Sequence, residues 1–97
     1  TNKMTAEQQK AKELIEKFRP FFDNQISKSS EHAYIKSIKI YNDNVKQCAI
    51  LCVDEEIKTL QGLKEKLQSM NLLDSTFEVM ALIDEKQTVK QEIINYK

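Results

Sequence analysis

Glycine and proline are nearly absent from this sequence, which holds one of each, Gly62 and Pro20, among 97 residues. Tight turns between β-strands depend on these residues, because glycine tolerates positive φ and proline fixes φ. Long helices with few connections need neither, and the abundant Lys, Glu, Gln, Leu and Ile favour the helix. The sequence therefore predicts an all-α chain. Its length suits a single helical domain, residues 1–97, with one core.

A capping pattern opens the first predicted helix. Thr5 and Gln8 have capping-box spacing, so each side chain can accept a hydrogen bond from the backbone N–H of the other residue. Pro20 ends the helix, because its ring disfavours helical geometry at the preceding residue. We expect residues 1–4 to be disordered. The apolar face of this helix is predicted to hold Ala11, Leu14, Ile15 and Phe18.

A long central helix is predicted over about residues 31–69, with Ser30 as its N-cap. Two adjacent apolar stripes run along it and give a broad face, which suits a helix with two neighbours. Residues 42–44 read Asn-Asp-Asn, a run of poor helix formers. A kink or a fresh helix start at 42–44 therefore stays open.

The third helix is predicted to follow a short turn at residues 71–74, with Ser75 and Glu78 at capping-box spacing. Thr88 and Gln91 repeat that spacing, so a break in the segment 84–88 also stays open. The expected architecture is a small three-helix bundle with a long central helix, or an antiparallel arrangement built around that helix.

Two cysteines lie one turn apart on the central helix, in an apolar stripe that begins at Tyr34 and ends at Cys52. A zinc site needs four ligands, and the only histidine, His32, lies about four turns from Cys48. We therefore interpret both cysteines as buried core residues. The sequence offers His32 no nucleophile to activate, and no phosphate-binding loop adjoins the acidic runs at residues 54–56 and 84–85. The sequence predicts no enzyme, no metal site and no cofactor.

Charged side chains are the candidates for contact with a partner. The 15 basic and 15 acidic residues balance, and a single arginine disfavours direct, specific binding to nucleic acid. Lysines of the central helix fall within one narrow sector. An acidic run, Asp54, Glu55 and Glu56, follows these lysines along the same helix. We favour its interpretation as a solvated helix face, and the alternative is a patch that binds a basic partner. The predicted partner-binding residues are Arg19, Lys36, Lys39, Lys46, Asp54 and Glu55.

A resemblance rests on three segments: KAKELIEKFRPF at residues 10–21, VKQCAILCVDEEI at residues 45–57 and VKQEI at residues 89–93. In this order they resemble a group of short, mostly uncharacterised helical proteins encoded by phages and prophages of Bacteroidota-type bacteria. In that group a Tyr-Trp pair precedes the last motif, whereas this chain has no Trp. The resemblance implies a phage-associated origin, and it implies no activity.

These observations together favour a non-enzymatic protein-binding module. With the resemblance, they suggest a phage-encoded inhibitor of a host defence system, of the anti-CRISPR type, that binds an effector nuclease or its RNA complex. No apolar run is long enough to span a membrane, and residues 1–10 are polar, so we expect the cytoplasm of a bacterial host cell. Two alternatives stay open: a homo-oligomeric structural or accessory phage protein, for which a homodimer is possible, and a weak nucleic-acid-binding accessory protein.

Overall fold

The computed structural model describes residues 3–23 and 26–96. They form helix α1 (Ala6–Phe18), the short 3-10 helix η1 (Arg19–Phe21), the long helix α2 (Glu31–Ser69) and helix α3 (Leu73–Ile94). No strand occurs in these two ranges, and none of their helices is both long enough and apolar enough to cross a bilayer. The prediction of a small all-α bundle with a long central helix is confirmed.

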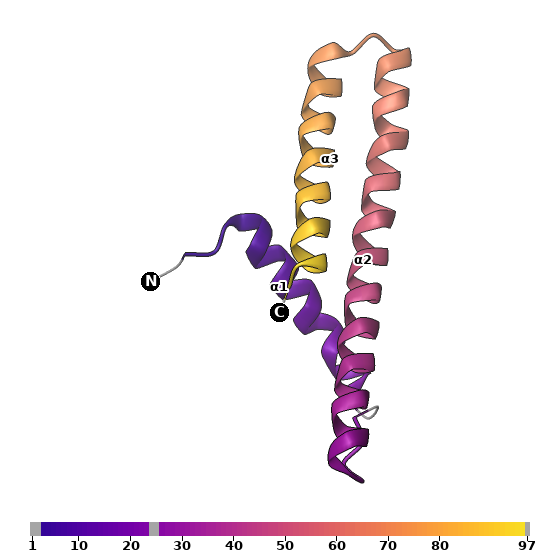
Figure 1. The fold of residues 1–97 in the computed structure, drawn as a ribbon. Coiled ribbons are helices and arrows are strands. Elements are labelled where there is room, and N and C mark those ends of the chain that lie inside the picture. The colour runs from indigo at the N-terminus through magenta and orange to yellow at the C-terminus, as the bar shows by residue number, and fades with distance from the viewer. Residues whose placement is uncertain (1–2, 24–25, 97) are drawn as a thin grey trace.

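Helices α2 and α3 run antiparallel as a hairpin, and α1 lies across the half of it that contains the start of α2 and the end of α3 (Figure 1). The length of α2 sets the shape of the molecule. Its 39 residues span about 58 Å at about 1.5 Å per residue, close to the longest dimension of the molecule, 61 Å. Among the described residues, α1 covers one half of the hairpin and nothing covers the half next to the turn.

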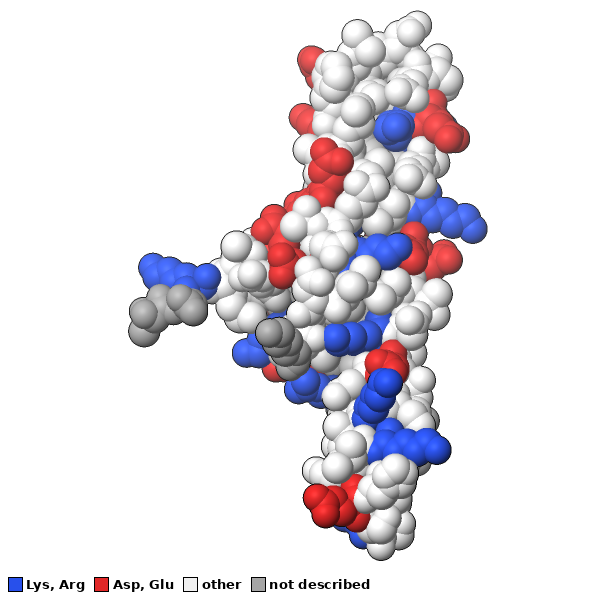
Figure 2. All heavy atoms as spheres, viewed as in Figure 1, with Lys and Arg blue, Asp and Glu red and all other residues white. Residues whose placement is uncertain are grey.

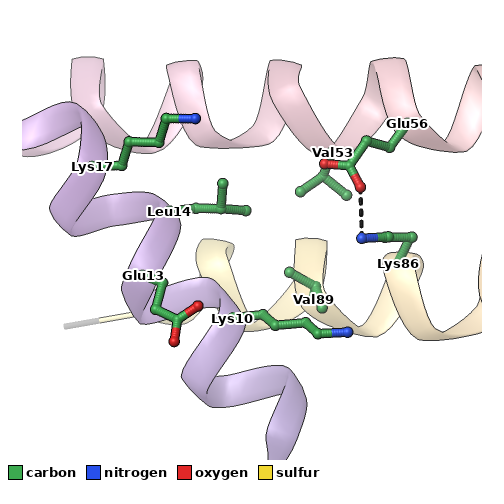
Figure 3. Close-up of a pocket in the computed structure, with 8 residues that line it drawn as sticks. All are labelled: Lys10, Glu13, Leu14, Lys17, Val53, Glu56, Lys86 and Val89. Carbon is green, nitrogen blue, oxygen red and sulfur yellow. Dashed lines mark ion pairs between the residues drawn. The ribbon is translucent and has the colours of Figure 1, made fainter.

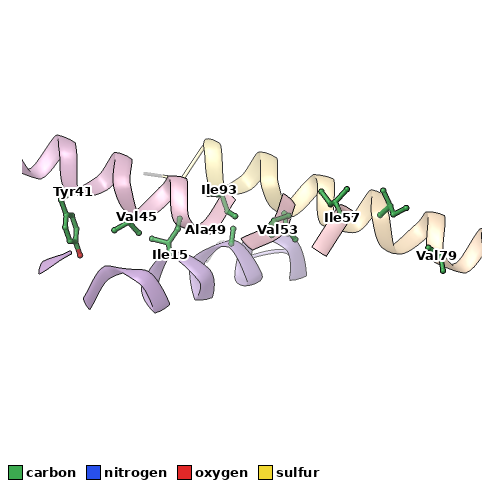
Figure 4. Close-up of a cluster of buried hydrophobic side chains, with 11 residues drawn as sticks. Ile15, Tyr41, Val45, Ala49, Val53, Ile57, Val79 and Ile93 are labelled. Atoms are coloured by element: carbon green, nitrogen blue, oxygen red, sulfur yellow. The ribbon is translucent and has the colours of Figure 1, made fainter. Parts of the chain in front are cut away.

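The core is one cluster of buried side chains shared by α1, α2 and α3 (Figure 4). The three helices meet at small side chains, since Ala11 of α1 and Ala49 of α2 are 1% and 0% exposed. On α2 the buried row repeats every four residues. The members of the cluster are Ala11, Ile15, Tyr41, Val45, Ala49, Val53, Ile57, Val79, Ile83, Val89 and Ile93.

The predicted helix starts of α1 and α2 are confirmed. The backbone N–H of Thr5 donates to Gln8 Oε1 at 3.0 Å, and that of Gln8 donates to Thr5 Oγ1 at 3.1 Å, which completes the capping box. Ser30 Oγ accepts a hydrogen bond from the backbone N–H of Ala33 at 3.1 Å. Helix α1 ends two residues before Pro20, which lies inside η1. These signals depend on neighbouring residues only, so the sequence alone is enough to place them.

The predicted capping box at Ser75 and Glu78 is wrong, because α3 begins two residues earlier, at Leu73, and has no side-chain cap. The hydrogen bonds that stabilise the turn cap the C-terminal end of α2 instead. Asn71 adopts a left-handed conformation with φ of 59°. Its N–H donates to the carbonyl of Gln68, and the N–H of the next residue donates to the carbonyl of Leu67, both at 3.1 Å. This pattern is a Schellman motif with asparagine in the position that glycine usually takes.

The two possible helix breaks are absent. Helix α2 is continuous through residues 42–44, because the flanking Tyr41 and Val45 are both buried in the core and packing outweighs weak local propensity. Helix α3 is continuous through 84–88, where Thr88 Oγ1 donates to the carbonyl of Asp84 at 3.1 Å as a residue inside the helix. Of the predicted disordered segment, residues 1–2 lie outside the described residues, and residues 3–4 are exposed and precede α1.

The interpretation of the cysteines as buried core residues is also wrong. Cys48 and Cys52 are only half-buried, and Cys52 Sγ donates to Glu56 Oε1 at 3.8 Å. The contact row on α2 consists of Val45, Ala49 and Val53 and their neighbours at spacing four. The cysteines flank this row, because the strip of α2 that faces α1 and α3 includes Tyr41 and Val45 from the stripe that ends at Cys52 but not the cysteines.

Adjacent isoleucines at the end of α3 test this core. Ile93 is 0% exposed and Ile94 is 47% exposed. We expect Ile93→Ala to lower the free energy of unfolding by about 2–5 kcal/mol, the usual cost of emptying a buried aliphatic site. The matched control Ile94→Ala should change it far less. Urea unfolding followed by circular dichroism measures both, and equal costs for the two variants would contradict the described core.

Candidate functional site

A cavity of about 270 Å³ lies where η1, α2 and the end of α3 meet. Two of the predicted partner-binding residues, Arg19 and Lys46, line it from different elements. Ile15 and Val45, both members of the core, contribute its apolar wall and point toward each other (Figure 4). The complete lining is Ile15, Arg19, Asn42, Val45, Lys46 and Tyr96.

The end of α3 holds both cationic side chains in place. The guanidinium carbon of Arg19 lies 5.9 Å from the centroid of the Tyr96 ring, within cation–π range. Lys46 Nζ donates to the carbonyl oxygen of Ile94 at 3.4 Å. That carbonyl belongs to the last turn of α3, where the helix dipole is negative. The fold therefore brings two positive charges to one recess.

The connection between η1 and α2 is fixed to the same region by polar contacts. Tyr41 Oη donates to Asp23 Oδ1 at 3.0 Å. Burial of the phenol and, to a lesser extent, this hydrogen bond raise the pKa of Tyr41. Further along, the backbone N–H of Ser27 donates to Ser37 Oγ at 2.8 Å. These contacts attach Asp23 and Ser27, on either side of residues 24–25, to α2.

The charge in the cavity is not neutralised from within the described part of the chain, where no carboxylate forms an ion pair with Arg19 or Lys46. A carboxylate or phosphate oxygen that enters the recess meets a guanidinium and an ammonium group, both strong donors to anions. The described residues contain no group of three His, Cys, Asp or Glu that could hold a metal ion. What the cavity offers chemically is anion recognition.

The six predicted partner-binding residues do not form one site. Arg19 and Lys46 line the cavity, whereas Lys36 and Lys39 are exposed further toward the start of α2. Asp54 forms an ion pair with Lys90 at 2.9 Å, so it contributes to the packing of α2 against α3. Glu55 is exposed and lines a different groove. Figure 2 shows basic side chains along much of α2, and acidic side chains gathered along the α3 edge.

Sequence reasoning missed two lining residues. In the sequence Asn42 stands out only as part of the run of poor helix formers at 42–44, and Tyr96 is an apolar residue near the end of the third predicted helix. A signal for Tyr96 was present, because the last residues of a third antiparallel helix must return to the level of the early part of the second. Nothing local to Asn42 indicates that its side chain lines a cavity.

One ion pair fastens α1 to the hairpin, and a second joins the two helices of the hairpin beside it (Figure 3). Lys10 of α1 pairs with Glu85 of α3, and Lys86 Nζ lies 2.6 Å from Glu56 Oε2 of α2. The hydrogen bond between Lys10 and Glu85 raises the pKa of Lys10 and lowers the pKa of Glu85. The attachment of α1 is thus coupled to the charge state of this pair.

Comparison of the chain with protein-family models, with curated proteins and with solved structures finds no match. The function is therefore argued from the geometry of the described residues.

The Lys10–Glu85 pair predicts a pH dependence. Because the pKa of Glu85 is lowered on folding, its contribution is present above the unfolded pKa and is lost as the pH falls through the folded pKa. Because the pKa of Lys10 is raised, its contribution is present below the unfolded pKa and is lost as the pH rises through the folded pKa. The pair should therefore stabilise the fold between roughly pH 4.3 and 10.4, the ordinary values of the two groups.

Thermal unfolding of wild type and Glu85→Gln across this range checks the prediction. We expect a lower Tm for Glu85→Gln at neutral pH, and a difference that shrinks as the solution becomes acid. Glu16→Gln is the control, since Glu16 lies 4.0 Å from Lys12 within α1 alone. A Tm difference that is as large in strong acid as at neutral pH would show that the pair does not act through its charge.

Proposed function

We propose that this chain is a non-enzymatic protein-binding module whose cavity between Arg19 and Lys46 takes an acidic side chain of the partner. One observation carries the proposal: two cations from separate elements converge on a recess in which no described carboxylate pairs with them. The recess of about 270 Å³ has an apolar wall and charged donors at its rim, a combination that orients a side chain entering from a partner.

A protein partner suits the charge distribution better than nucleic acid does. Nucleic-acid binding depends on many phosphate contacts along an extended basic stripe. Here the net charge is zero and there is one arginine, and the two cations define a single recess. Lys36 and Lys39, exposed on α2, extend the positive surface and favour the approach of an acidic protein surface.

The finer form of the proposal is a phage-encoded inhibitor of a host defence system, of the anti-CRISPR type. Its support is the resemblance of residues 10–21, 45–57 and 89–93 to phage-encoded helical proteins. An inhibitor that blocks an effector nuclease, or the complex of that nuclease with RNA, by occupying its surface needs no catalytic residues. Such a protein would act in the cytoplasm of the bacterial host.

Affinity capture with charge-neutral variants tests the cavity. We expect the wild-type chain to retain a stoichiometric partner from a bacterial lysate. Arg19→Gln with Lys46→Gln should weaken binding of the purified partner by about tenfold or more, since each lost charge-assisted hydrogen bond costs about 1.5–3 kcal/mol. The matched control, Lys12→Gln with Lys58→Gln, removes the same charge elsewhere and should bind as wild type does.

Two results would count against the proposal. Equal affinity of the cavity variant and the wild type would remove the cavity from the interface. Capture of DNA or RNA alone, with affinity that falls steeply as salt rises, would favour the nucleic-acid alternative. A captured protein unrelated to host defence would leave the binding module standing and overturn its finer form.

A second candidate function, a homodimeric structural or accessory protein, is favoured by a different observation. Leu73, Phe77 and Met80 form one row on α3 and are 62%, 62% and 40% exposed. Light scattering at micromolar concentration should then give twice 11.3 kDa, and Phe77→Glu should return the mass to that of one chain with unchanged helix content. A wild-type chain that is monomeric throughout the concentration range removes this candidate.

A further inference from the structure

The groove between α2 and α3 continues beyond α1. Beside α1 it forms a cavity that includes Val53, Val89 and the ion pair of Glu56 with Lys86 (Figure 3). The same two charged residues also line the next stretch of groove, of about 400 Å³, toward the turn. That stretch is lined by Glu55, Glu56, Thr59, Leu60, Leu82 and Lys86. The open groove is thus continuous with the interface that α1 already uses.

The open stretch repeats the residues that hold α1, one heptad further toward the turn. On α2, Leu60 lies seven residues after Val53, and on α3, Leu82 lies seven residues before Val89. Seven residues are nearly two helical turns, so each pair lies on the same side of its helix. The difference is coverage: Val53 and Val89 are 0% and 1% exposed, whereas Leu82 is 45% exposed.

The polar rim repeats in the same way. Glu78 lies seven residues before Glu85 on α3. Glu85 forms an ion pair with Lys10 of α1. Glu78 is exposed, and no ion pair with it occurs within residues 3–23 and 26–96. A basic side chain placed over Glu78 would reproduce the contact that Lys10 makes with Glu85.

The spacing of this repeat matches the packing of two helices. Seven residues advance a helix by about 10.5 Å, and helices pack with their axes about 8–10 Å apart. A helix that lies beside α1 therefore reaches Leu60, Leu82 and Glu78 in the register in which α1 reaches their equivalents. Leu63, 44% exposed and three residues from Leu60, widens the apolar floor.

We propose that this open stretch, lined by Leu60 and Leu82 and flanked in sequence by the exposed Leu63 and Glu78, docks an amphipathic helix of a partner protein beside α1. The partner helix carries a Lys or Arg one turn before an apolar residue, as Lys10 precedes Leu14 in α1. The surface is separate from the Arg19–Lys46 cavity, so the proposal does not depend on the function assigned to that cavity.

A peptide with the sequence of residues 3–22, which includes α1, is the natural probe, because α1 is a helix that fits this type of site. Labelled and titrated with the whole chain, it should bind saturably, as measured by fluorescence anisotropy. Leu82→Glu and Glu78→Lys should each weaken binding by about tenfold or more. Leu51→Glu is the matched control, since Leu51 is 62% exposed and lies on the side of α2 opposite Leu60 at about 100° per residue. All variants are first checked for wild-type helix content and Tm.

A charge reversal makes the test specific. A peptide with Lys10→Glu should bind the wild-type chain weakly and the Glu78→Lys variant about tenfold more tightly. Three results would overturn the proposal. The first is the absence of saturable binding to the wild-type chain. The second is binding that is unchanged by Leu82→Glu and Glu78→Lys, which would mean that the peptide only replaces α1. The third is dimerisation of the wild-type chain that Leu82→Glu abolishes, which would assign the groove to a second copy.

Discussion

The burial of α1 against one half of the α2–α3 hairpin is the contact on which the rest of the structure depends. Two long helices that touch only each other expose most of their apolar surface. Helix α1 closes a three-sided core around Ile15, Val53 and Ile93, and its own attachment adds the ion pair of Lys10 with Glu85. Because α1 has 13 residues and α2 has 39, this core is necessarily confined to part of the hairpin. The open stretch of groove next to the turn follows from that mismatch in length.

Local signals were sufficient for much of the fold. Thr5, Ser30 and Pro20 act on the backbone within a few residues of themselves, so their effects follow from short-range geometry. The turn between α2 and α3 is harder to predict from the sequence. It depends on the left-handed conformation of Asn71, and the capping pattern of the third helix does not indicate that conformation. Which strip of α2 is buried is harder still to predict from the sequence. The angle at which α1 crosses the hairpin selects this strip, and that angle is a property of the packed molecule.

The candidate cavity shows the same division between local and tertiary information. Charge patterning pointed to Arg19 and Lys46, which are far apart in the sequence and belong to different elements. Only the fold shows that they share one recess with the end of α3. Charge patterning also points to Asp54, and here the antiparallel register of the hairpin places Lys90 opposite this carboxylate. A charge on a helix face is open to a partner only if no neighbouring helix supplies its counter-ion.

Stability of the fold accounts for only part of the apolar surface of Leu63 and Leu82. A side chain that keeps nearly half of its surface in water gains only about half of the roughly 1.5–3 kcal/mol that full burial of a leucine gives. Neighbouring positions on the same helices do carry charge, such as Lys66 and Glu78. Leu82 stands at the heptad position equivalent to Val89 beneath α1, and a second helix placed there would bury the surface that the core leaves open.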